Sequence, residues 1–103
     1  MDAARDIATV TLVGEWDLSR QSELRTILER AEGLDPVIVD LTQVHYMDST
    51  MIRELIAFVK TRNGLGPPRI VAPSNGRPAK LFRLASLDDY FDIYETIGAA
   101  AIV

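Results

Sequence analysis

The sequence predicts an α/β domain built on a single-layer, mixed but mainly parallel four-stranded sheet with helices packed on it. Two observations lead to this fold class: apolar, strand-type runs alternate with segments of helical period, and the connections between them are short. Short helical crossovers between apolar strands are typical of open, mainly parallel sheets. The chain shows no internal repeat and no linker, so residues 1–103 are expected to form one domain.

The first strand and helix are predicted from a change of period. β-Branched Thr9, Thr11 and Val13 alternate with their neighbours over residues 7–13, which is typical of a strand. Over residues 19–32, apolar residues recur at the i, i+3, i+4, i+7 spacing of a helix with one buried face.

The second strand and helix follow a proline break. Residues 37–39 form a continuous β-branched run, which suits a strand covered on both faces. Helical period returns over residues 49–62, and its apolar stripe predicts that Arg53 and Glu54 face solvent.

The remaining elements are shorter. Residues 70–72 form a third apolar run, and Pro78 fits the first turn of a helix that extends to about residue 87. Residues 91–94 are expected to form the fourth strand, and Thr96 is expected to cap a tail helix that runs to residue 103.

Composition excludes several classes of function. The net charge of -4 and the scattered basic residues argue against a nucleic-acid surface. The absence of Cys and the single His exclude thiolate and multi-histidine metal sites, so no metal and no cofactor are expected. No apolar run is long enough to span a membrane and the N-terminus lacks a signal-peptide core, so a cytoplasmic protein without membrane insertion is expected.

The most informative segment precedes the second helix. Open α/β sheets place their sites beyond the carboxyl ends of the strands, and Asp48, Ser49 and Thr50 lie there as consecutive residues that can cap a helix. If Asp48 is the cap, Met47 and Ile52 take hydrophobic-staple positions; if Ser49 is the cap, its hydroxyl accepts from a backbone N–H. Both alternatives describe a helix start without any further function.

A second interpretation adds a phosphate to Ser49. A helix N-terminus carries partial positive charge and free amide donors, so it tolerates an anion. A phosphate brings a charge of about -1.5 to -2 to a surface that already holds Asp48. Such a change alters what can dock there without unfolding the domain.

Other candidate groups are weaker. Glu15 and Asp17 could form a carboxylate pair, be solvated, or cap the next helix, and Trp16 between them is a contact residue if exposed and core if buried. His45 lies in an expected loop without a visible nucleophile. Because nucleophile, base and oxyanion donors cannot be assembled, the protein is not expected to be an enzyme.

These residues carry a resemblance to the STAS domain family, the anti-sigma factor antagonists (anti-anti-sigma factors). Residues 47–50, Met-Asp-Ser-Thr, look like the family's phosphorylation signature, and residues 14–17, Gly-Glu-Trp-Asp, look like the end of its strand before the first helix. The resemblance covers nearly the whole chain and implies a STAS-like fold. Its supporting segments are residues 10–17, 37–41, 44–50, 70–72, 81–84 and 91–94.

The resemblance also implies a function in bacterial transcription regulation and signal transduction. In that family, the unphosphorylated domain binds a partner that is both serine kinase and anti-sigma factor, phosphorylation releases the domain, and a PP2C-type phosphatase resets it. By resemblance, Ser49 is the acceptor, Asp48 its acidic neighbour and Thr50 the second hydroxyl. Glu15 and Asp17 would lie on the adjacent contact surface.

Two positions depart from the family signature. Met51 and Arg53 occupy places where family members usually have glycine, and both are expected on the partner-binding surface. Bulky side chains there imply either a different partner or a serine that is no longer phosphorylated. The second case gives an alternative function, a non-switching STAS scaffold or transporter-accessory subunit.

The N-terminus departs as well. Six residues precede Ile7, where the family commonly has another strand. A missing first strand leaves a sheet edge unpaired, and such edges must be covered or blunted. Homodimerisation through this edge is therefore a hypothesis.

A different class remains as a further alternative. Asp40 ends a predicted buried strand, and Glu15 and Asp17 could add metal oxygens, as in a receiver-like domain phosphorylated on aspartate. No Lys follows the strand at residues 70–72, where such a site needs a cation, so this alternative is the weaker one.

Overall fold

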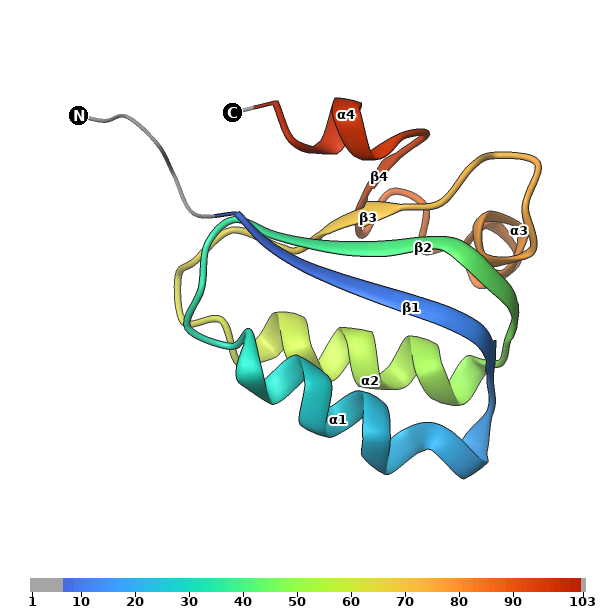
Figure 1. Cartoon of the computed structure of the whole chain (residues 1–103), viewed down its shortest axis with the longest axis horizontal. Helices are drawn as coiled ribbons and strands as arrows, with labels where there is room; N and C mark the ends of the chain where they lie inside the picture. The colour runs from blue at the N-terminus through green and yellow to red at the C-terminus, as the bar shows by residue number, and fades with distance from the viewer. Residues whose placement is uncertain (1–6, 103) are drawn as a thin grey trace.

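A parallel four-stranded sheet organises the chain, in a computed structural model that describes residues 7–102. The strand order is β1-β2-β3-β4, and all three strand pairings are parallel, so the predicted mainly parallel sheet is confirmed (Figure 1). The prediction that the family's first strand is missing concerns residues 1–6, which lie outside the described residues. The elements are β1 Ala8–Trp16, the 3-10 turn η1 Leu18–Arg20, α1 Gln21–Arg30, β2 Val37–Met47, α2 Ser49–Lys60, β3 Arg69–Val71, α3 Arg77–Leu84, β4 Asp92–Tyr94 and α4 Ile97–Ala100.

The helices cover the two faces of the sheet unequally. α1 and α2 lie together on one face, while the short α4 lies on the other (Figure 1). The large core lies on the α1/α2 side and also takes in Phe82 of α3. On the α4 side, Ile38, Val71 and Ala100 form a small second cluster. Most of the hydrophobic stabilisation therefore comes from one face, which fixes the position of α2.

β1 and β2 are longer than predicted. The first strand was expected over residues 7–13, but β1 continues to Trp16 with a register shift between Gly14 and Glu15. Gly14 has φ +93°, a left-handed conformation that glycine adopts without strain. β2 continues beyond residue 39 because β1 supplies it with a parallel partner as far as Met47. The expected loop around His45 is therefore strand.

Glu54 is not on the solvent side of α2, as the helical stripe predicted, but is 7% exposed. Its carboxylate accepts hydrogen bonds from Gln21 Nε2 at 2.8 Å and from Arg25 Nη2 at 2.8 Å and Nε at 3.2 Å. Burial of a charged group is tolerated when the group is paired and hydrogen-bonded. Glu54 thus joins α1 to α2 by a polar contact at the border of the core.

Glu54 makes a pH-dependent contribution to stability. The Arg25 hydrogen bond, followed by the one from Gln21, holds the pKa of Glu54 below its usual value, despite the opposing effect of burial. A lowered pKa in the folded state means that the contribution is complete above the unfolded-state value of about 4.3 and is lost as the pH falls through the folded-state pKa. We expect the stability difference between wild type and Glu54→Gln, measured by urea denaturation, to shrink steadily below about pH 4.3. A difference that stays constant from pH 7 to pH 3 would contradict this assignment.

The helices are short. α2, with 12 residues, is the longest helix within residues 7–102, and none of the described helices has the length and apolar character needed to cross a membrane.

Candidate functional site

The candidate site is the surface where the end of β1 meets the start of α2. Trp16 pairs with Met47 in the sheet, and the backbone N–H of Asp48 donates to the carbonyl of Trp16 at 3.3 Å. These contacts place the residues around Ser49 beside the last residues of β1.

Asp48, and not Ser49, is the cap of α2. Its Oδ1 accepts from the backbone N–H of Thr50 at 3.0 Å and of Met51 at 3.4 Å. Met47 and Ile52, in the staple positions on either side of the capping turn, are both buried in the core. A capping side chain contributes about 1 kcal/mol, and here that contribution comes from Asp48.

Ser49 is therefore free of a capping role. It is the first residue of α2 and is exposed, and no hydrogen bond within residues 7–102 involves its Oγ. The expectation that modification of this hydroxyl leaves the helix start intact has a physical basis, because the bonds that fix the first turn belong to the neighbouring residue.

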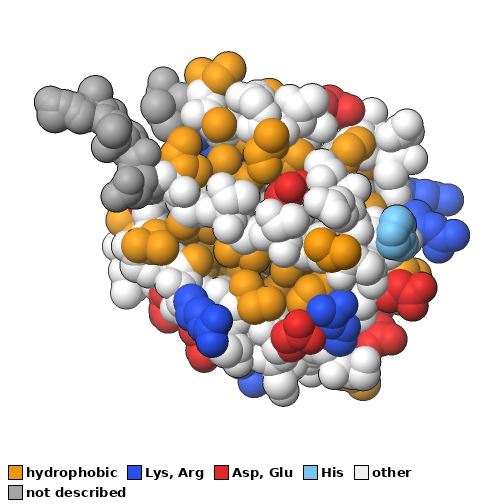
Figure 2. Space-filling view, in the orientation of Figure 1, with side chains coloured by type: hydrophobic (Ala, Val, Ile, Leu, Met, Phe, Trp, Pro, Cys, Tyr) orange, Lys and Arg blue, Asp and Glu red, His pale blue; other side chains and the backbone are white. Residues whose placement is uncertain are grey.

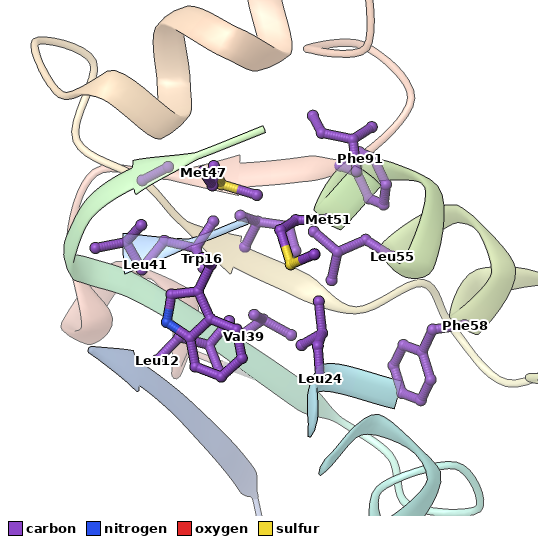
Figure 3. Close-up of a cluster of buried hydrophobic side chains, with 14 of the residues drawn as sticks. Leu12, Trp16, Leu24, Val39, Leu41, Met47, Met51, Leu55, Phe58 and Phe91 are labelled. Atoms are coloured by element: carbon purple, nitrogen blue, oxygen red, sulfur yellow. The ribbon is translucent and has the colours of Figure 1, made fainter. Parts of the chain in front are cut away.

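Trp16 belongs to the core. It is 2% exposed and packs in the large cluster beside Leu12 and Val39 (Figure 3). Its Nε1–H donates to the carbonyl of Val13 at 3.1 Å, so the polar edge of the ring is also satisfied. Trp16 therefore does not offer a contact surface.

Arg20 orders the end of β1, and sequence reasoning missed it. Its guanidinium lies 3.5 Å from the centroid of the Trp16 ring and donates from Nη1 to the carbonyl of Glu15 at 3.0 Å. It also binds Glu23 through two hydrogen bonds of 2.9 Å. The partners in β1 are an aromatic face and backbone oxygens, which no charge pattern in the sequence reveals.

The two acids near the site have different environments. Asp17 caps η1: Ser19 donates to it from both hydroxyl and backbone, and the side-chain bond is the main cause that lowers the pKa of Asp17. Glu15 is exposed and pairs with Tyr46 in the sheet. The capping alternative therefore holds for Asp17.

A surface hollow connects these acids to basic and aromatic groups. It is lined by Glu15, Asp17, His45, Tyr46 and Arg77. Figure 2 shows the histidine of the chain at one end of the molecule, with basic side chains beside it and acidic ones nearby. The hollow thus brings charges of both signs together beside the end of β1, with Glu15 from β1 and Arg77 from α3.

Of the two residues that depart from the family signature, one is buried and the other is exposed. Met51 is 0% exposed and lies in the core, so the expectation that its side chain is on the partner-binding surface is wrong. Its spacing to Leu55 and Phe58, which are also buried, is that of a single helix face. Arg53 is exposed on α2, as expected.

A receiver-like metal site is not assembled. Asp40 lies within β2 and not at its end, and its buried carboxylate accepts from the backbone N–H of Thr42 at 2.9 Å. Asp40 pairs with Thr11 of β1, whereas Glu15 pairs with Tyr46 further along β2. Within the part of the chain that is described, no group of three or more His, Cys, Asp or Glu could hold a metal ion.

Fold and site together define a class: a parallel α/β domain whose candidate site is an exposed helix start beside the end of a neighbouring strand. The STAS domain family model matches residues 1–100. The chain belongs to the STAS domain family, and the resemblance noted from residues 47–50 and 14–17 is confirmed at the level of the family.

Solved structures agree with this assignment. An anti-sigma factor antagonist from Mycobacterium paratuberculosis matches with a TM-score of 0.77 and 23% identity, covering 96% of this chain and 86% of that chain. The Bacillus cell fate determinant SpoIIAA in its phosphorylated form matches with a TM-score of 0.62 and 16% identity, covering 96% of this chain and 92% of that chain. A sulfate transporter family protein from Wolinella succinogenes matches with a TM-score of 0.71 and 16% identity, covering 91% of this chain and 80% of that chain. At these identities the matches establish the shared fold.

Proposed function

We propose that this protein is a regulatory binding module that acts as an anti-sigma factor antagonist. In this proposal it is not an enzyme: unmodified, it binds an anti-sigma serine kinase in the cytoplasm, and phosphorylation of Ser49 releases it. A PP2C-type phosphatase returns it to the binding state. The contact surface comprises Glu15, Asp17, Asp48, Ser49, Thr50 and Arg53.

The observation that carries the proposal is the exposed Ser49 hydroxyl beside a cap that does not depend on it. Oδ1 of Asp48 holds the first turn of α2, so a phosphate on Ser49 replaces no structural bond. A phosphate at the first turn of a helix is also favoured by the helix dipole. The surface can therefore change charge while the domain keeps its fold, which is what a reversible switch requires. The match to a phosphorylated SpoIIAA supports the same assignment.

Mapping of phosphate tests the proposal. We expect incubation with the cognate serine kinase and ATP to add one phosphate, located on Ser49 by mass spectrometry. Ser49→Ala is expected to remove it, while Ser22→Ala, which changes an exposed serine of α1, leaves it in place. Phosphate on another residue, or none, would refute the switch.

A second function is favoured by one comparison. The match to a sulfate transporter family protein fits a non-switching scaffold or a transporter-accessory subunit. In that case Ser49 has no regulatory role, and a negative charge at position 49 leaves the partner bound. Substitution of Arg53 on the exposed side of α2 is then the change that weakens binding.

The proposal includes a homodimer formed through β1. Within residues 7–102, β1 pairs with β2 on one edge and with no strand on the other, and Val13 is 54% exposed. Hydrophobic side chains reach the surface on the side of the molecule where β1 lies (Figures 1 and 2). An unpaired strand edge is a template for pairing with a second chain. Sedimentation that shows a monomer at all concentrations would reject the dimer.

A further inference from the structure

Arg53 lies one helical turn after Ser49 on α2. Residues four apart in a helix are neighbours on its surface, and long side chains in helices point back toward the helix start. A guanidinium at position 53 can therefore reach back to a group on residue 49. Both side chains are exposed, so neither is held in place by the core.

The guanidinium of Arg53 has no partner within the described part of the chain. No hydrogen bond and no ion pair among residues 7–102 uses it. Its other helical neighbours at three or four residues are Thr50, Ile56 and Ala57, none of which is acidic. A phosphate on Ser49 is the group that would supply a negative charge at the right spacing.

We propose that Arg53 binds the phosphate of phosphorylated Ser49 and so forms an intrahelical ion pair at the start of α2. This inference rests on the proposed function, because it assigns a partner to the phosphate. A negative group placed four residues before a positive one has the favourable orientation in a helix. The bonds are charge-assisted, and the planar guanidinium fork matches the geometry of phosphate oxygens.

The ion pair would offset the repulsion between the phosphate and Asp48. Asp48 carries its own negative charge directly before Ser49, and its Oδ1 is committed to the amides of Thr50 and Met51. A phosphate therefore meets repulsion from Asp48, which the positive charge of Arg53 offsets. Phosphorylation would then withdraw Arg53 from the contact surface at the same time as it charges Ser49. One modification thus changes two residues that a partner could recognise.

A phosphorus NMR titration tests the ion pair without any kinase. Phosphoserine is installed at position 49 during synthesis of the full chain, in the wild-type background and with Arg53→Gln, Arg53→Lys or Lys60→Gln. The cation at Arg53 stabilises the dianion, so we expect its removal in Arg53→Gln to raise the second pKa of the phosphate by about 0.3–0.6 units. We expect this rise in the phosphate pKa to be smaller in about 0.5 M salt, because salt at that concentration screens the interaction between exposed charges.

The variants separate the ion pair from general charge effects. Arg53→Lys keeps the charge and is expected to restore most of the wild-type value. Lys60→Gln removes a positive charge from the far end of the same helix and is expected to leave the value unchanged. Equal phosphate pKa values in the wild type and Arg53→Gln would overturn the inference. Because the phosphate is installed chemically, this outcome is independent of whether a kinase modifies Ser49.

Discussion

Ser49→Asp is expected to weaken binding to the regulatory partner by about 100-fold or more, while the domain stays folded. A fixed negative charge at the centre of a contact surface costs several kcal/mol when a partner that fits the neutral hydroxyl must desolvate it. The fold is retained because Asp48 still caps α2 and because an acidic residue in the first turn is favoured by the helix dipole. The measurement is calorimetric titration with the partner recovered on a Ser49→Ala bait and then purified.

Ser22→Asp is the matched control. It adds the same charge to an exposed serine of a different helix, α1, and we expect binding within about twofold of wild type. Ser49→Ala is expected to bind like the unmodified protein. If Ser49→Asp binds as tightly as Ser49→Ala, the switch is wrong and the scaffold function gains support.

The order and type of the elements could be predicted from the sequence because their periodicities are strong. The strands at residues 37–39 and 70–72 are continuous apolar runs, and the helix at residues 49–62 carries a clear apolar stripe. The turn that precedes α2 was equally visible, since residues 48–50 are all helix-capping types. Local chemistry alone limits the cap to Asp48 or Ser49, and the geometry selects Asp48.

What could not be predicted depends on contacts between distant segments. The second half of β2 is rich in polar residues and becomes a strand because β1 pairs with it. Glu54 is buried because Arg25, 29 residues earlier, reaches it from another helix. Met51 was wrongly expected on the partner-binding surface. Its spacing to Leu55 already indicated the buried face, but the position was assigned by analogy with a glycine that the family usually has there.

Arg62 is another residue whose role depends on distant segments. Its side chain is 1% exposed, although it follows directly after the last turn of α2. Nε donates to the carbonyl of Gly66 at 2.6 Å, Nη1 to the carbonyl of Glu32 at 3.5 Å, and Nη2 to Oδ1 of Asp35 at 3.2 Å. The guanidinium also lies 5.3 Å from the ring centroid of Phe58. One side chain thus joins α2 to the segment after α1 and to the loop before β3.

We expect Arg62→Ala to lower the free energy of unfolding by about 2–3 kcal/mol. The loss has two sources: carbonyl oxygens that lose their donor, and a cavity where the buried stem packed. It stays below the cost of breaking a fully buried ion pair because Asp35, at 44% exposure, regains water. Urea denaturation measures the loss. Arg62→Lys, which keeps the charge but not the fork, is expected to recover part of it.

Because of its position, Arg62 can also be used to separate an effect on stability from an effect on partner binding. It lies at the opposite end of α2 from Ser49, so its loss weakens the packing of the domain and leaves the candidate site untouched. In the cold, where the variant is folded, we expect Arg62→Ala to bind the partner with wild-type affinity. Arg30→Ala, an exposed change at the end of α1, is expected to alter stability by less than about 0.5 kcal/mol. If Arg62→Ala is as stable as Arg30→Ala, the buried guanidinium does not hold these segments together. If it is destabilised but also loses binding in the cold, the two ends of α2 are coupled and Ser49 is not an independent site.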